Sequence, residues 1–102
     1  MADSQAIICP KQEANTPAIV DDATALASNT ARAGWSIQNL GTNPLFVLLG
    51  SGASATVFHH VLKGGTGNDD GNGASLFQDA GVIYTGIITI AGTTPRYVVT
   101  EL

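Results

Sequence analysis

The chain has 102 residues and a formal net charge of −4, and it contains only four lysine and arginine residues in total. Charged residues make up 12% of the chain, against a usual ~25% in globular proteins. So few basic side chains exclude a phosphate-binding surface for nucleic acid and a polybasic patch for anionic lipid. The length predicts a single domain with one hydrophobic core.

The single cysteine, Cys9, excludes an intrachain disulfide and a zinc site made of several cysteines. The longest apolar run, Leu45–Leu49, is far shorter than the ~20 residues that a membrane-spanning helix needs. Residues 1–11 have no basic start and no long apolar stretch, so they do not look like a secretory signal. We therefore expect a protein that is made in a cytosol and that does not contact a membrane.

Residues 1–23 differ from the rest of the chain and are predicted to form a partly extended N-terminal arm. Within this arm, residues 6–9 are a short candidate strand that Pro10 ends, and residues 17–20 are a second candidate. Residues 22–29, where the arm meets the domain, favour one helical turn or an open corner. We expect the arm to become ordered on reaching a neighbouring subunit.

Residues 24–102 are predicted to form the folded domain. Short runs of Val, Ile, Thr, Phe and Tyr dominate this part of the chain, and Gly, Asn and Pro separate them. Turn signals recur about every 8–12 residues, which is typical of all-β proteins. The predicted strands are 32–40, 45–49, 56–62, 74–77, 82–90 and 96–101. The fold class is therefore all-β: a single antiparallel β-sandwich or jelly-roll-like barrel of about 6–8 short strands with an extended N-terminal arm.

Two pairs of consecutive strands are predicted to form hairpins. Residues 82–90 would pair with 96–102 through a Gly-Thr-Thr-Pro turn, and residues 32–40 with 45–49 through a Gly-Thr-Asn-Pro turn. Alternation of side chains predicts which residues share a face of the sheet. In strand 32–40, Trp35, Ile37 and Asn39 share one face. In strand 96–101, Tyr97 and Val99 share one face.

The glycine-rich segment 63–73 contains one motif of known chemistry. Gly64–Asp69 matches the GGxGxD core of calcium-binding nonapeptide repeats, in which neighbouring copies complete the coordination of the ion. Only one copy is present, the glutamate of an EF-hand is missing, and no GK[ST] follows as in a phosphate loop. We interpret the segment as a Gly-Asn-Asp loop that makes contacts in an assembly, and we expect neither a metal nor another cofactor.

Catalysis needs a base, a nucleophile and an orienting group, and the sequence offers no such constellation. His59 and His60 are adjacent in a predicted strand, so their side chains point to opposite faces, with one expected toward the core or an interface. Cys9 has no partner motif, and the pairs Asp21-Asp22 and Asp69-Asp70 have the character of loop acids. We therefore expect the protein not to be an enzyme.

Three larger side chains have a structural and a functional interpretation. Trp35 is expected in the core or an interface, with sugar stacking as the alternative. Arg32 is expected to pair with Glu101 or Asp79 across strands, or to contact a partner. For Arg96 the same choice between an internal pair and a partner stays open.

A combination of motifs carries a resemblance to a known group of proteins. Arg32–Val47 contains an arginine, a short strand ending in Ile-Gln-Asn, a Gly-Thr-Asn-Pro turn and an apolar strand. Tyr84–Ile87, the Gly92-Thr93 turn and the final strand Val98–Glu101 follow. In this combination, residues 24–102 resemble the small virion structural proteins of tailed bacteriophages.

The resemblance implies a β-sandwich or jelly-roll-like module in a virion that is made in the cytoplasm of a host bacterium, with no catalytic residues to assign. The leading hypothesis is a capsid decoration or cement protein that binds the shell in many copies. The expected partners are the major capsid protein or other virion subunits, and further copies of the chain in a trimer or dimer. The alternatives are a neck, tail or fibre subunit, or a receptor- or glycan-binding module with Trp35, Tyr84 and Tyr97 around a groove.

The residues expected at assembly contacts come from the arm, from the first long strand, from the glycine-rich loop and from the last strand. They are Ile7, Ile8, Pro17, Arg32, Trp35, Asn68, Asp69, Asp70 and Arg96.

Overall fold

The computed structural model describes residues 7–13 and 19–102, and in these residues it contains strands and no α-helix. No helix in this part of the chain is therefore long and apolar enough to cross a membrane. The eight strands are β1 (Ile7–Glu13), β2 (Ile19–Leu26), β3 (Trp35–Asn39), β4 (Leu45–Leu49), β5 (His60–Leu62), β6 (Ser75–Gln78), β7 (Ile88–Thr93) and β8 (Arg96–Glu101).

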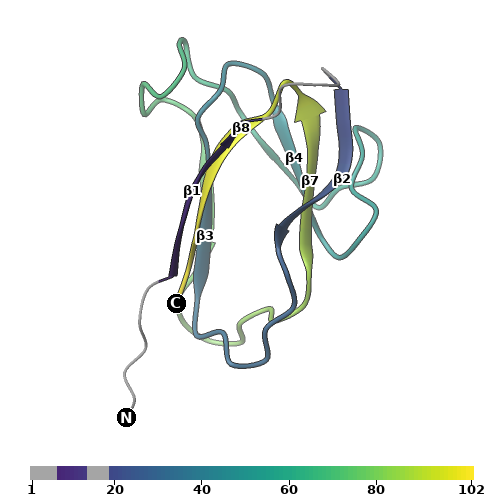
Figure 1. The fold of residues 1–102 in the computed structure, drawn as a ribbon, viewed down its shortest axis with the longest axis vertical. Coiled ribbons are helices and arrows are strands. Elements are labelled where there is room, and N and C mark those ends of the chain that lie inside the picture. The colour runs from purple at the N-terminus through teal and green to yellow at the C-terminus, as the bar shows by residue number, and fades with distance from the viewer. Residues whose placement is uncertain (1–6, 14–18) are drawn as a thin grey trace.

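The strands form two antiparallel sheets that face each other (Figure 1). Sheet A has the order β1-β8-β3-β6, and sheet B has the order β2-β7-β4-β5. The chain crosses between the sheets at nearly every connection, and the first and last strands lie side by side. This strand order is that of an eight-stranded jelly roll, in which two Greek keys share one core. The predicted all-β sandwich is confirmed.

Both predicted hairpins are wrong, because each joins strands of different sheets. β3 lies in sheet A and β4 in sheet B, and β7 and β8 are divided in the same way. Among the described strands, β4 and β5 are the consecutive pair that hydrogen bonds within one sheet. A tight turn reverses the chain whether the next strand pairs with the previous one or crosses to the other sheet. The turn residues therefore do not determine which sheet the next strand joins.

The first two strands are parts of the sheets. β1 pairs with β8, and the predicted boundary between residues 23 and 24 falls inside β2, which pairs with β7. β1 continues through Pro10, with a register shift between Cys9 and Gln12. Sheet edges and bulges are the positions where a sheet tolerates proline, because a missing N–H does least harm there.

The segment from Ala23 to Leu26 is extended and lies in β2, so the predicted helical turn is wrong there. Asp22 has a φ of 51° within a register shift between Val20 and Ala23. Its Oδ1 accepts a hydrogen bond from Gly52 N at 2.6 Å, and its own N–H donates to Ala53 O at 2.8 Å. The local sequence favoured Asp22 as the cap of a helical turn. The hydrogen bonds to Gly52 and Ala53, in the connection after β4, hold it in a strand instead.

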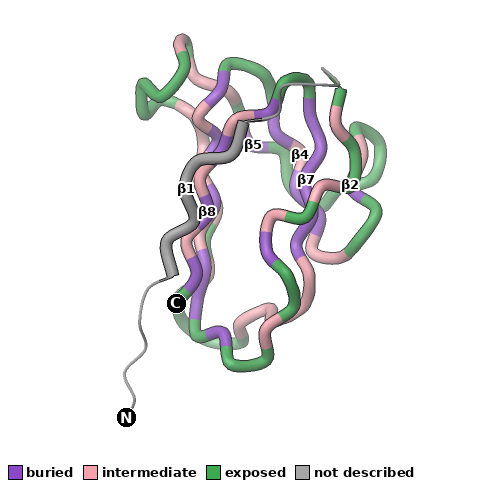
Figure 2. Tube along the Cα trace, in the orientation of Figure 1, coloured by how far each residue is buried: buried purple, intermediate pink, exposed green. Residues whose placement is uncertain are grey.

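The core lies between the sheets, and Figure 2 shows buried stretches along β7 and β8. β3 and β8 alternate between buried and half-buried residues, as the sequence predicts for Trp35, Ile37, Asn39, Tyr97 and Val99. β7 is buried on both faces, because the connection after β4 covers its outer side. The largest core cluster consists of Leu26, Trp35, Ile37, Leu45, Val47, Leu62, Ile88, Ile90, Tyr97 and Val99.

We predict that Ile90→Ala lowers the free energy of unfolding by about 2–5 kcal/mol, because the side chain is fully buried and leaves a cavity. The matched control is Ile19→Ala on β2, where the side chain is 67% exposed and the loss should stay near 0.5 kcal/mol. Urea denaturation followed by tryptophan fluorescence measures both. Equal losses in the two variants would contradict the assignment of the core.

Candidate functional site

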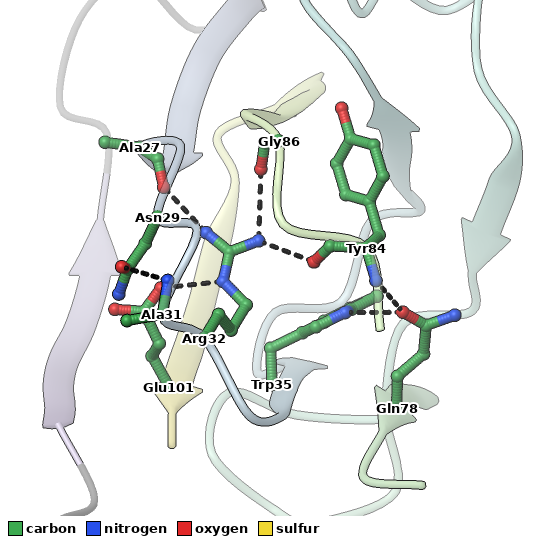
Figure 3. A network of polar contacts seen from close by, with 9 residues as sticks. All are labelled: Ala27, Asn29, Ala31, Arg32, Trp35, Gln78, Tyr84, Gly86 and Glu101. Atoms are coloured by element: carbon green, nitrogen blue, oxygen red, sulfur yellow. Dashed lines mark hydrogen bonds and ion pairs between the residues drawn. The ribbon is translucent and has the colours of Figure 1, made fainter. Parts of the chain in front are cut away.

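Arg32 lies at the centre of a buried polar network (Figure 3). Its side chain is fully buried, and Nε donates to Glu101 Oε2 at 2.7 Å. Nη1 donates to the carbonyl oxygens of Tyr84 at 2.9 Å and Gly86 at 3.0 Å. Nη2 donates to Ala27 O at 2.6 Å. One guanidinium thus joins the β2–β3 connection, the β6–β7 connection and the end of β8.

Backbone bonds close the same end of the sandwich. Ala33 N donates to Leu102 O at 2.7 Å, and Leu102 N donates to Gly34 O at 2.9 Å. The sequence left Glu101, Asp79 or another subunit as the partner of Arg32, and in the structure Arg32 pairs with Glu101. Because the arginine side chain is buried inside its own chain, it is not placed to contact another subunit.

Trp35 lies in the core, as expected, and is only 3% exposed. Its Nε1 donates to Gln78 Oε1 at 2.9 Å, and Tyr84 N donates to the same oxygen at 2.9 Å. The indole is therefore held by packing and by one hydrogen bond, and its face is not available for stacking on a sugar.

At the opposite end of the sandwich, Asp70 organises the glycine-rich loop. Its Oδ2 accepts hydrogen bonds from Thr66 N at 3.0 Å, Thr66 Oγ1 at 2.7 Å and Gly67 N at 2.8 Å. Its Oδ1 accepts one from Asn72 N at 2.9 Å. The Thr66 hydroxyl, followed by the Asn72 backbone amide, holds the pKa of Asp70 well below its usual range, because these donors stabilise the charged carboxylate.

Asp69 anchors the same loop to the body of the domain. Arg96 binds its carboxylate through two parallel bonds, Nε to Oδ1 at 2.8 Å and Nη2 to Oδ2 at 2.6 Å. Asp69 N donates to Leu40 O at 2.7 Å, and Gly65 N donates to Gly41 O at 2.8 Å. The loop is therefore tied to the β3–β4 connection and to β8 by contacts within the chain.

A polar hollow of about 250 Å³ lies beside this loop, lined by Thr42, Asn43, Asn68, Thr94 and Arg96. Its lining comes from three connections between sheets A and B and from β8. Asn43 Nδ2 donates to Thr93 O at 3.0 Å, which fixes one wall. Since the Arg96 guanidinium is already bound to Asp69, the hollow offers amide and hydroxyl groups and little net charge.

Two surface areas expose large apolar side chains. On sheet A, Phe77 is 62% and Leu102 41% exposed, and both line a groove of about 170 Å³ with Trp35, Ser36, Asp79 and Thr100. On sheet B, the rings of Phe46 and Phe58 lie 5.0 Å apart, beside the exposed Val57 and Val61. Sequence reasoning missed both areas. The signal was present in β6, where adjacent apolar residues at 76 and 77 must face opposite sides.

The nine residues predicted at assembly contacts do not gather in one patch. Ile7 and Ile8 lie in β1, where their backbone pairs with Glu101 and Thr100 of β8. Pro17 lies outside the described residues. The other six divide between the buried network and the loop end: Arg32 and Trp35 in the first, and Asn68, Asp69, Asp70 and Arg96 in the second.

Titratable residues do not converge in the described part of the chain, where no group of three or more His, Cys, Asp or Glu residues is placed to hold a metal ion. His59 Nδ1 accepts a bond from Leu49 N at 3.1 Å, and His59 and His60 are both exposed, so neither faces the core. No protein-family model, curated protein or solved structure matches this chain.

We predict that Arg32→Met lowers the free energy of unfolding by about 3–5 kcal/mol, because it leaves Glu101 buried without its partner. Adding Glu101→Leu removes that charge, so the double variant should lose less than the sum of the two single losses. The control is Arg96→Met at the more exposed pair with Asp69, for which we expect a smaller loss, because Asp69 is partly exposed and stays solvated. Urea denaturation measures all four, and strictly additive losses would refute the coupling.

We predict that EDTA leaves the melting temperature unchanged and that millimolar calcium does not raise it. The oxygens of Asp70 already accept hydrogen bonds from N–H and O–H donors, and Asp69 is bound to Arg96. Differential scanning calorimetry of the full chain tests this. A drop in EDTA that calcium restores would show that the Gly64–Asp69 motif binds the ion.

Proposed function

We propose that this chain is a non-enzymatic structural protein of a tailed bacteriophage virion, and that it decorates the capsid, binding the outer shell in many copies. The observation that carries the proposal is the eight-stranded jelly-roll order of its two sheets. Jelly rolls with two Greek keys recur in viral capsid proteins and in lectin domains. A fold does not imply a function by itself, so the individual residues have to support the choice.

The residues that carry the sequence resemblance have structural roles. Arg32 holds the buried network at one end of the sandwich. Asn39 is buried, its Nδ2 donates to the carbonyls of Asn43 and Leu62, and its Oδ1 accepts from Gly41 N. Arginine, the Ile-Gln-Asn strand end and the following glycine therefore specify a way of folding, which is what proteins that share a scaffold would have in common.

The distribution of charged groups supports a structural role. The two arginines that are described bind carboxylates of the same chain, one pair buried and the other at the surface. The apolar side chains on sheet B, Phe46, Phe58 and their neighbours, lie on a face rather than in a deep cleft. Faces of this kind suit contact with other subunits, and binding across neighbouring shell subunits adds its free energy to the stability of the particle.

The three aromatic residues expected around a glycan- or receptor-binding groove are not placed for that role. Trp35 and Tyr97 are buried in the core, and the hydroxyl of Tyr84 donates to Ile87 O at 2.9 Å. None of the three provides the exposed ring on which a sugar would stack. A neck, tail or fibre subunit is a further alternative, and it differs from a decoration protein in the number of copies.

The experiment is to measure the copy number of this chain in purified particles relative to the major shell protein, by quantitative mass spectrometry. We predict a copy number comparable with that of the shell protein. A copy number of only a few to tens would favour the neck, tail or fibres over decoration. Absence of the chain from particles would refute the virion proposal.

A further inference from the structure

We propose that the free edge of β6 pairs with β6 of a second copy of this chain, so that the two A sheets join into one eight-stranded sheet. The inference goes beyond the proposed function and is independent of it, because the purified chain can test it without a particle.

The edge strands are β1 and β6 in sheet A, and β2 and β5 in sheet B. Proteins protect such edges against pairing by proline, charge, bulges or shortness. β1 contains Pro10 and a register shift. β2 contains two register shifts and the exposed charges of Asp21 and Asp22. β5 is only three residues long.

β6 has no proline, charge or register shift, and it is one residue longer than β5. Its four residues, Ser-Leu-Phe-Gln, include no charge and no proline, and they pair with β3 without a register shift. Phe77 in this strand is 62% exposed. Sheet A therefore ends in a regular, uncharged edge that carries a large apolar side chain, which is the kind of edge that accepts another strand.

A second β6 fits this edge around a two-fold axis perpendicular to the sheet. Antiparallel pairing places directly opposite residues on the same face, and a two-fold axis makes the contact self-complementary. The register centred on Phe77 keeps both outer faces on one side and brings the two Phe77 side chains opposite each other. Aromatic cross-strand pairs of this kind stabilise sheets.

No charge repulsion opposes this register. Phe77 faces Phe77, Leu76 faces Gln78, and Ser75 faces Asp79 of the second copy, so no charge lies opposite a like charge. The contact consists of one short strand and the side chains beside it, which is smaller than a standard interface. We therefore expect a weak dimer, with a Kd of roughly 10–100 µM.

Sedimentation velocity over a concentration series of the full chain tests the proposal. We expect Phe77→Lys to raise the dimer Kd at least tenfold, because it places a charge on each side of the pair. The matched control is Val61→Lys, a 47% exposed valine on β5, the edge strand of the other sheet. This control should leave the Kd unchanged, and circular dichroism verifies that both variants remain folded.

A cross-link tests the register independently. In a Cys9→Ser background, Phe77→Cys should form a symmetric disulfide on mild oxidation, because opposite Cα atoms in an antiparallel pair lie within disulfide range. Val61→Cys should not. The proposal is overturned if the wild type stays monomeric over the whole concentration series, or if Val61→Lys dissociates the dimer and Phe77→Lys does not. A monomer that still decorates particles would refute this inference alone and leave the proposed function standing.

Discussion

The buried ion pair between Arg32 and Glu101 is the interaction on which the arrangement of the sandwich depends. Moving a guanidinium and a carboxylate out of water is costly, and their attraction offsets the cost only when the remaining donors are also satisfied. Arg32 meets this condition with carbonyls of Ala27, Tyr84 and Gly86. The β2–β3 connection, the β6–β7 connection and the last strand must therefore reach their places together. A buried charge with four fixed partners tolerates few other arrangements of this end.

The two ends of the sandwich use the same chemistry in different surroundings. At one end an arginine–carboxylate pair is buried and holds three chain segments. At the other end Arg96 and Asp69 form a more exposed pair, and Asp70 collects the backbone amides of a glycine-rich loop. Hydrogen bonds to its carboxylate lower the pKa of Asp70, so the loop keeps its charged organising group at a lower pH than an ordinary aspartate would. Internal contacts thus organise both ends of the sandwich, and the sheets carry exposed apolar side chains such as Phe77 and Val61.

This division suits a protein that works by forming contacts. Exposed apolar side chains include Phe77 on sheet A and Val57, Phe58 and Val61 beside sheet B. Two-fold pairing through β6 would use the edge of sheet A and leave the patch on sheet B available. Under the two proposals, the chain joins its own copies through sheet A and binds the shell through sheet B. The small number of charged residues fits surfaces that are covered in an assembly.

The sequence by itself determined the all-β class and the inward faces of β3 and β8. It also named Glu101 among the residues with which Arg32 was expected to pair. These depend on local alternation and on residue chemistry, which act over a few positions. Only the tertiary structure decided which sheet each strand joins, that β1 passes through Pro10, and that the segment after Asp22 is extended. A turn reverses the chain without specifying a partner. Each strand can pair with several segments that are distant in the sequence. Packing of the shared core and the hydrogen bonds of the buried Arg32 determine which of these pairs form.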